Sequence, residues 1–141
     1  MLIKQLSIFL ENKKGRFTEV TNILGNAGIN MTAFTVAENS DFGIVRLIVS
    51  DPEAARSILR EHRYAVSVTD VICLQTPNKP GSLAQVMTIL ADAEVFIEYM
   101  YAFSFGNGAL VVIRPDNLEK TMAVLSENKV ELLASDELFA L

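Results

Sequence analysis

The feature that most constrains this chain is an internal repeat. The stretch NKKGRF at 12–17 returns as NKPGSL at 78–83, which sets an offset of 66 residues between Gly15 and Gly81. The same offset aligns, without a gap, Val20 with Val86, Ile23 with Ile89, Leu24 with Leu90, Val45 with Val111, Glu53 with Glu119, Leu59 with Leu125 and Asp70 with Asp136. Two copies indicate tandem domains, because a solenoid needs about three or more repeats. The predicted domains are residues 1–69 and 70–141.

Each copy has the same predicted order of elements. Short apolar and β-branched runs predict strands, and apolar residues on one helical face predict a helix after each repeated glycine. The predicted strands are residues 2–10, 30–38, 44–50 and 64–70 in the first copy and 70–76, 96–103, 109–114 and 130–135 in the second. The order βαββαβ is that of a ferredoxin-like α+β domain, an antiparallel sheet with helices on one face.

The signals at the helix ends differ between the copies. Gly28 is predicted to end the first helix, because glycine enters the left-handed region freely. The second copy has Glu94 there, so its helix is predicted to end differently. The second helices are predicted to begin at the capping boxes Ser50-x-x-Glu53 and Asp116-x-x-Glu119 and to run to Arg63 and Asn128. Asp51 before Pro52 is an equally good start in the first copy.

The chain carries more apolar surface than two small domains hide easily. Half of its residues are apolar and 21% are charged. Both faces of the strand at 96–103 are apolar; alternation puts Phe96, Met100 and Ala102 with Glu98 on one face and Ile97, Tyr99, Tyr101 and Phe103 on the other. We therefore expect a second domain or subunit, in a homodimer, to cover the sheet. The alternative is that this strand is simply rich in aromatic residues and that nothing covers the sheet.

Charge and composition argue against several classes of partner. The formal net charge of −5 argues against nucleic acid, including RNA stacked on Tyr99, Tyr101 and Phe103. No run approaches the roughly 20 apolar residues of a membrane helix, and the start of the chain has no pattern of a secretory signal. The single cysteine, Cys73, excludes an internal disulfide and favours a cytoplasmic setting.

The chain shows little that predicts catalysis. Its single histidine, His62, stands among charged residues and is interpreted as a surface side chain, and Cys73 is interpreted as a small buried hydrophobe. Neither has a neighbour in sequence that predicts a metal site. No nucleophile elbow, phosphate loop or dinucleotide fingerprint is present. The sequence therefore predicts a binding protein without a cofactor rather than an enzyme.

The repeated glycine turn is the candidate binding site. It leads from a strand into a helix N-terminus, where unpaired N–H groups attract a small anion. Glycine lets a ligand approach the backbone, and Pro80 stiffens the second turn. A carboxylate held there, with an amide or acidic side chain for the ammonium group, describes recognition of a free amino acid; the candidate polar groups are Asn12, Asn78, Asn30 and Glu98. The alternative is that the glycine serves only to form the turn and that no ligand binds there.

Each copy also resembles an ACT domain, a regulatory module of amino-acid metabolism. The resemblance is carried by LENKKGRFTEVTNILGNAGINMTAF (10–34) and QTPNKPGSLAQVMTILADAEVFIEYM (75–100). Three positions depart from the family pattern: Lys14 replaces proline, Glu94 replaces the helix-ending glycine, and Phe96 stands where the first copy has Asn30.

The resemblance implies amino-acid sites at the seams between paired domains. Carried over by position, it nominates Asn12, Gly15, Arg16, Asn30 and Met31 in the first copy and Asn78, Pro80, Gly81, Ser82, Leu83 and Glu98 in the second. Because Phe96 replaces asparagine, one or both copies could hold a working site. Apolar residues at 31, 34, 96 and 100 favour a hydrophobic ligand unless they belong to the core.

The resemblance further implies a regulatory, amino-acid-sensing protein that acts on a partner enzyme or transporter. Two alternatives remain at this stage. One is a ligand-free ACT-type module that docks on a partner enzyme, which the departures at Glu94 and Phe96 favour. The other is a small ferredoxin-like enzyme, an alternative that only similarity of fold supports.

Overall fold

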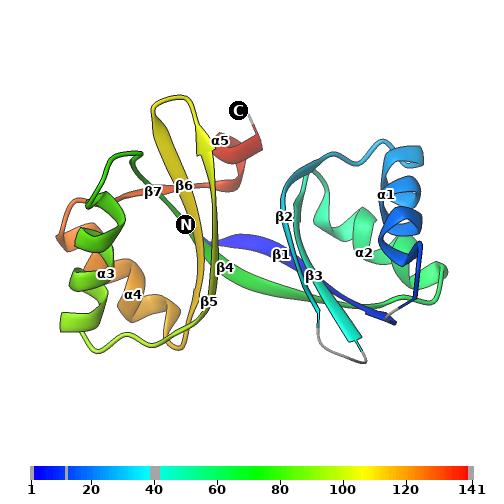
Figure 1. Cartoon of the computed structure of the whole chain (residues 1–141), viewed down its shortest axis with the longest axis horizontal. Coiled ribbons are helices and arrows are strands. Elements are labelled where there is room, and N and C mark those ends of the chain that lie inside the picture. Colours follow the sequence, from blue (N-terminus) through cyan, green and yellow to red (C-terminus); the bar gives the residue numbers. More distant parts are fainter. Residues whose placement is uncertain (1, 12, 39–41, 140–141) are drawn as a thin grey trace. The chain divides into compact units, whose positions relative to one another are not determined.

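The computed structural model describes residues 2–11, 13–38 and 42–139. The chain divides into two compact units (Figure 1). The first unit spans Lys4–Thr69, and the second runs from Asp70 onward together with the segment before residue 4.

The first unit carries two helices on one face of an antiparallel sheet (Figure 1). Its elements are β1 (Ile3–Glu11), α1 (Arg16–Asn26), β2 (Met31–Glu38), β3 (Phe42–Val49), α2 (Pro52–Glu61) and the start of β4 (Ala65–Pro77). The strand order is β2-β3-β1, with β4 next to β1. Apolar residues from α1 and α2 pack on one side of β1 and β3; the fully buried ones include Leu6, Ile8, Val20, Leu24, Val45, Leu47 and Leu59.

The second unit repeats this arrangement. After β4 come α3 (Ser82–Asp92), β5 (Ile97–Phe105), β6 (Gly108–Pro115), α4 (Leu118–Glu127), β7 (Glu131–Leu133) and α5 (Ser135–Phe139). The strand order is β5-β6-β4, with β7 on the other side of β4. Its core includes Ile72, Leu74, Leu90, Val111, Ile113 and Leu125. The predicted α+β, ferredoxin-like βαββαβ architecture is confirmed in both units.

The fourth strand of the first copy and the first strand of the second are a single strand, β4, of 13 residues. Nothing between Ala65 and Thr76 breaks a strand, and the stretch from Val71 to Leu74 is fully buried. The last predicted strand, at 130–135, is shorter than expected. It ends at Leu133, and Ser135 begins α5, whose first turn is acidic and whose Glu137 Oε1 accepts a bond of 3.2 Å from Ala134 N.

The predicted alternation along β5 is wrong at its start. A register shift between Ile97 and Tyr99 inserts an extra residue, so Ile97 and Met100 both pack against the core of the second unit. The first unit has the same irregularity between Met31 and Ala33, its repeat-related position. Such a bulge depends on pairing with a distant strand, which strict alternation cannot anticipate.

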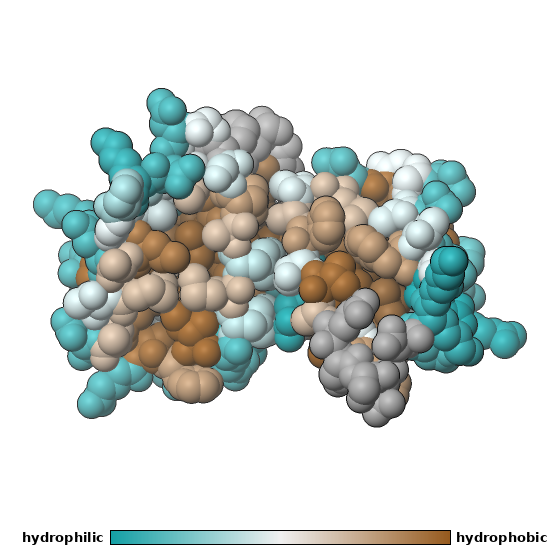
Figure 2. All heavy atoms as spheres, in the orientation of Figure 1, coloured by the Kyte–Doolittle hydropathy of each residue, from teal (hydrophilic) through white to brown (hydrophobic). Residues whose placement is uncertain are grey.

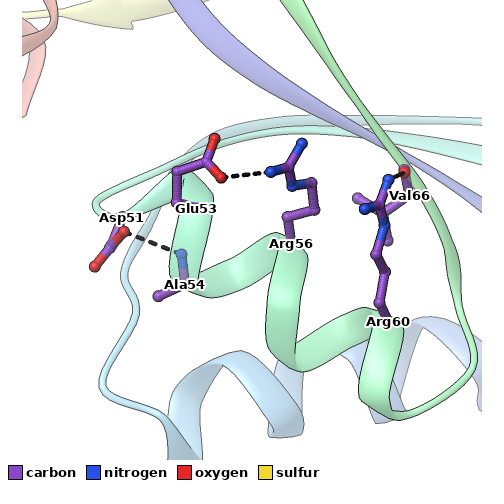
Figure 3. Close-up of polar contacts among 6 residues, drawn as sticks. All are labelled: Asp51, Glu53, Ala54, Arg56, Arg60 and Val66. Atoms are coloured by element: carbon purple, nitrogen blue, oxygen red, sulfur yellow. Dashed lines mark hydrogen bonds and ion pairs between the residues drawn. The ribbon is translucent and has the colours of Figure 1, made fainter.

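The second helix of each unit begins one residue later than the capping boxes predict. Figure 3 shows this start for α2. Asp51 Oδ1 accepts a bond of 3.1 Å from Ala54 N, so the alternative start before Pro52 is the correct one. In the second unit Asn117 Oδ1 accepts from Lys120 N at 3.0 Å. Figure 3 also shows the pair between Arg56 and Glu53, at 2.6 Å, and Arg60 donating to the Val66 carbonyl.

The residues predicted to cap instead bind the start of the second strand. Ser50 Oγ accepts from Asn30 N at 3.0 Å, while Ser50 N donates to Asn30 O at 3.0 Å. Asp116 repeats this arrangement with Phe96: its Oδ1 accepts from Phe96 N at 3.3 Å, and its N–H donates to Phe96 O at 2.9 Å. We call these two contacts the strand braces. Each uses only backbone groups of residue 30 or 96.

All four long helices end in the same way. A residue with positive φ follows each of them: Gly28 (72°), Arg63 (67°), Glu94 (59°) and Lys129 (59°). The prediction for Gly28 is confirmed, and the prediction that the second copy ends its helix differently is wrong. Glu94 N donates to Ala91 O at 3.0 Å, matching the bond of 3.1 Å from Gly28 N to Gly25 O. Capping hydrogen bonds offset the cost of a left-handed glutamate.

Candidate functional site

The repeated turns open two helix N-termini. Gly15 and Gly81 precede α1 and α3 in the left-handed conformation, with φ of 85° and 86°, and no side-chain hydrogen bond caps either helix. By contrast, side chains cap both α2 and α4. The N–H groups of Arg16 and Ser82 donate within the turns, to Lys13 O at 3.4 Å and Lys79 O at 3.1 Å. The N–H groups of the next two residues of α1 and α3 have no partner within their helix and can serve an acceptor, and the helix dipole favours a negative charge there.

A pocket of about 250 Å³ lies at the first turn. We call it the first pocket. Its lining comes from the end of β1, the turn, the start of α1 and the neighbouring strands; the residues are Leu10, Glu11, Lys13, Lys14, Gly15, Arg16, Phe17, Thr18, Val36 and Gly43. The pocket therefore joins an open helix start to the edge strand β2.

A pocket of about 240 Å³ lies at the second turn. This second pocket is lined by Thr76, Pro77, Asn78, Lys79, Leu83, Ala102, Phe103, Ser104, Ala109 and Val111. Six lining pairs are related by the 66-residue offset: Leu10 with Thr76, Glu11 with Pro77, Lys13 with Lys79, Phe17 with Leu83, Val36 with Ala102 and Gly43 with Ala109. The two units thus form a hollow at the same place.

The two pockets differ in charge. Lys13 Nζ lies 2.9 Å from Glu11 Oε2 in the first pocket, and an Arg16 guanidinium nitrogen lies 3.7 Å from the same oxygen. The hydrogen bond and charge of Lys13, and then the charge of Arg16, lower the pKa of Glu11. In the second pocket Lys79 is the one charged lining residue, and Asn78 Nδ2 donates to Ser104 Oγ at 3.4 Å.

The structure brings some of the nominated residues together. Gly15 and Arg16 line the first pocket, and Asn78 and Leu83 line the second. The turn residues Pro80, Gly81 and Ser82 lie in the same segment as Asn78 and Leu83 without lining the second pocket. Asn12 lies outside the described residues.

Other nominated residues lie away from the pocket of their own unit. Asn30 and Met31 stand at the start of β2, where Asn30 takes part in a strand brace and Met31 packs against the core. Glu98 stands at the bulge of β5, with its carboxylate 3.6 Å from Arg114 Nε. Sequence reasoning did not nominate the contributions of β2 and β5, such as Val36, Ala102 and Phe103. The repeat is the one sequence signal that could have pointed to them, because the 66-residue offset pairs Val36 with Ala102.

Groups that could act in catalysis are dispersed in the described part of the chain. Burial raises the pKa of Cys73 to about 12, so its thiol stays protonated at neutral pH. His62 is exposed, and its Nδ1 lies 2.9 Å from Ile58 O. Among the described residues, no three His, Cys, Asp or Glu side chains gather as metal ligands. Nor does any described helix have the length and hydrophobicity to cross a membrane.

Comparison with known proteins identifies the family. A model of the ACT domain pair matches residues 1–141. The chain belongs to the ACT domain pair family. ACT domains are regulatory modules that bind amino acids, and the resemblance recognised in the sequence is therefore confirmed. No curated protein sequence is detectably similar to this chain.

Solved structures agree with this assignment. Protein BT0572 from Bacteroides thetaiotaomicron is 54% identical to this ACT domain pair, with a TM-score of 0.96 over 100% of this chain and 98% of that one. The regulatory subunit of aspartate kinase from Thermus thermophilus, in a ligand-free form, has a TM-score of 0.66 at 15% identity, covering 89% of this chain and 90% of that one. The corresponding subunit from Thermus flavus has a TM-score of 0.64 at 14% identity, over 88% and 90%. At these low identities the two subunits share the fold, and by name they are regulatory rather than catalytic.

Proposed function

We propose that this ACT domain pair is a cytoplasmic sensor of free amino acids that regulates a partner enzyme or transporter of amino-acid metabolism. The observation that carries the proposal is the pair of repeat-related pockets, each at an uncapped helix start. Family membership supplies the class of ligand. A ligand signals only through its differential affinity for two arrangements of the protein.

The backbone of each turn suits the carboxylate of an amino acid. The N–H groups at the start of α1 and α3 would donate to it, in the partial positive field of the helix end. A Cβ at Gly15 or Gly81 would meet no atom within 4 Å, so the space beside each glycine is open to a ligand. In the second pocket Asn78, whose amide nitrogen donates to Ser104, keeps its amide oxygen for an ammonium group.

Residues outside these pockets complete the proposal. Asn30, Met31 and Glu98 do not line the pocket of their own unit, so we assign them to the matching site of a neighbouring copy in a homodimer. Asn12, Pro80, Gly81 and Ser82 remain in the proposed sites as turn residues. A dimer seen by light scattering would support this part, and a monomer at every accessible concentration would contradict it.

The lining of the pockets suggests two different ligands. Lys13, Lys14 and Arg16 outnumber Glu11 in the first pocket, which favours an acidic amino acid. Leu83, Phe103 and Val111 dominate the second pocket, which favours an apolar one. We therefore expect the two pockets to differ in specificity despite their common backbone.

Thermal unfolding in the presence of each of the twenty amino acids at millimolar concentration tests the proposal. A ligand that binds the native state raises the apparent Tm by mass action. We expect a rise with one or a few amino acids, lost in Gly15→Ala or Gly81→Ala. Gly25→Ala is the matched control, because Gly25 lies within α1 and away from both pockets. No rise with any amino acid would contradict the proposal.

A second candidate function is a module that docks on a partner without a ligand. Phe96 is 67% exposed, and Phe9, Phe34 and Phe42 are each at least half exposed. Hydrophobic residues also gather on the viewed surface of each unit (Figure 2). Large exposed apolar side chains of this kind mark protein interfaces. An unchanged Tm with all twenty amino acids, together with co-purification of one enzyme that Phe96→Asn abolishes, would favour this function.

A further inference from the structure

A third cavity, of about 280 Å³, lies within the first unit. Its lining comes from the end of β1, the start of α1 and the segment that leads from α2 into β4; the residues are Phe9, Glu11, Arg16, His62, Arg63 and Tyr64. We call it the arginine cavity. It shares only Glu11 and Arg16 with the first pocket.

The cations of the arginine cavity are only partly compensated by nearby carboxylates. Glu11, its one acidic lining residue, is paired with Lys13 at 2.9 Å. Arg16 lies 3.7 Å from Glu11 and 3.8 Å from Glu19, both longer than the roughly 2.7–2.9 Å of a charge-assisted hydrogen bond. Arg63 is exposed and forms no side-chain hydrogen bond or ion pair with the described residues. Two guanidinium groups therefore retain donors for a ligand.

Tyr64 adds a further donor. Its hydroxyl oxygen is enclosed and lies beside Glu19 and Arg16, although neither side chain meets it with good hydrogen-bond geometry. Enclosed hydroxyl groups are nearly always well hydrogen-bonded, so the imperfect contacts of this one call for an explanation. Burial, and then the hydrogen bond and charge of Glu19, raise the pKa of this phenol, while Arg16 acts in the opposite direction, so the phenol keeps its proton at neutral pH. An anion in the cavity would compete with Glu19 for this donor.

The second unit shows that the fold itself does not require these side chains. By the 66-residue offset the six lining residues correspond to Gln75, Pro77, Ser82, Asn128, Lys129 and Val130. The second unit keeps one cation, Lys129, where the first has Arg63, and has no counterpart of Arg16, His62 or Tyr64. Both units nevertheless form the same βαββαβ architecture. The set in the first unit is therefore a feature of that unit alone.

From this arrangement the geometry points to a binding site for a small oxyanion, a phosphate or a carboxylate, in the arginine cavity. Arg16 and Arg63 present planar forks that match the paired oxygens of such a group. His62 Nδ1 contacts Ile58 O, so its other ring nitrogen, Nε2, is the one that can face a ligand. The exposed ring of Phe9 offers an apolar wall for the rest of the ligand. This site shares Glu11 and Arg16 with the first pocket, but the case for it does not rest on the proposed amino-acid binding.

The shared lining gives the site a regulatory consequence. An oxyanion that draws Arg16 toward the arginine cavity removes positive charge from the first pocket. Any such coupling must be reciprocal, so a ligand of the first pocket would change the affinity for the oxyanion by the same factor.

Titration of the full chain with inorganic phosphate and, separately, with succinate, followed by amide chemical shifts in NMR, tests the site. We expect saturable shifts at residues 62–64 and at Arg16 with at least one probe, and the comparison of the two probes separates phosphate from carboxylate. Arg63→Gln should weaken binding at least fivefold, and His62→Asn, which removes the ring from the cavity, should weaken it less. Lys129→Gln, the repeat-related change in the second unit, should leave the affinity unchanged.

Three results would overturn the inference: no saturable shift with either probe, equal shifts around Lys129, or unchanged affinity in Arg63→Gln. These results are distinguishable from failure of the amino-acid proposal. Arg63 and His62 line neither of the two turn pockets, so the response of Tm to amino acids should persist in both variants.

Discussion

The turns before α1 and α3 have nearly the same backbone and very different side chains. Both pass through a left-handed glycine, with φ of 85° and 86°, and both open a pocket toward the second strand of their unit. The first is lined by Lys13, Lys14 and Arg16, and the second by Leu83 and Phe103. The difference indicates that the backbone provides the common carboxylate site, whereas the lining selects the ligand.

Substituting the two glycines tests whether the turns are truly equivalent and should give the largest effect. Gly15→Ala and Gly81→Ala place a Cβ on a left-handed residue, which costs about 1–2 kcal/mol. Urea denaturation should show similar losses in the free energy of unfolding for both. Gly25→Ala, in a helix, should instead raise it by about 0.5–1 kcal/mol. Markedly unequal losses at Gly15 and Gly81 would break the comparison.

Exchanging the residue after each glycine tests whether charge selects the ligand. Arg16→Ser should weaken binding of an acidic amino acid to the first pocket about fivefold, or about 1 kcal/mol, because an exposed charge contact contributes at most about that much. Ser82→Arg should make the second pocket more receptive to the same ligand. Calorimetric titration measures both. Thr18→Ala is the control, since it changes an uncharged lining residue to its counterpart, Ala84.

Exchanging the residues with positive φ that follow α1 and α3 should change the free energy of unfolding somewhat less. Glu94→Gly should raise the free energy of unfolding by about 0.5–1 kcal/mol, because glycine removes the cost of the left-handed conformation but gains entropy in the unfolded chain. Gly28→Glu should lower it by a similar amount. Thermal and urea unfolding measure both changes. A loss of stability in Glu94→Gly would mean that the glutamate side chain has a role beyond the helix end.

The smallest expected difference between the two turns is in how their contribution to stability depends on pH. Lys13 and Arg16 lower the pKa of Glu11 below its ordinary value of 4.5, and the second turn has the uncharged Pro77 at that position. A lowered native pKa adds stability above the unfolded pKa, and this contribution is lost as pH falls through the native pKa. The difference in stability between the wild type and Glu11→Gln should therefore be constant near neutral pH and shrink below about 4.5. A difference that grows on acidification would contradict the assignment.

Much of the fold could be predicted from sequence because the signals are local and doubled. Apolar and β-branched runs predict the strands, helical periods and capping signals predict the long helices, and each copy supports the prediction for the other. The errors occur where a distant contact decides between two local solutions. Ser50 and Asp51 are equally good caps, and the bond of Ser50 to Asn30 leaves the capping position to Asp51.

The candidate site was only partly predictable for the same reason. The turn glycines are visible in sequence, because their backbone conformation requires them. The lining from β2 and β5 depends on strand register after a bulge, which no local pattern reveals. The arginine cavity joins residues about 50 positions apart, from Arg16 to Tyr64, and its charged helix end looks in sequence like an ordinary solvated surface.

The strand braces also bear on how two copies of one module diverge. Because Ser50 and Asp116 hold only the peptide groups of residues 30 and 96, the side chains at these two positions do not take part in the braces. Substitution there is free of that structural constraint, so asparagine and phenylalanine can occupy equivalent places. The fold thus leaves a position beside the second strand open to evolution, where a duplicated module can acquire a new recognition property before it loses the old one.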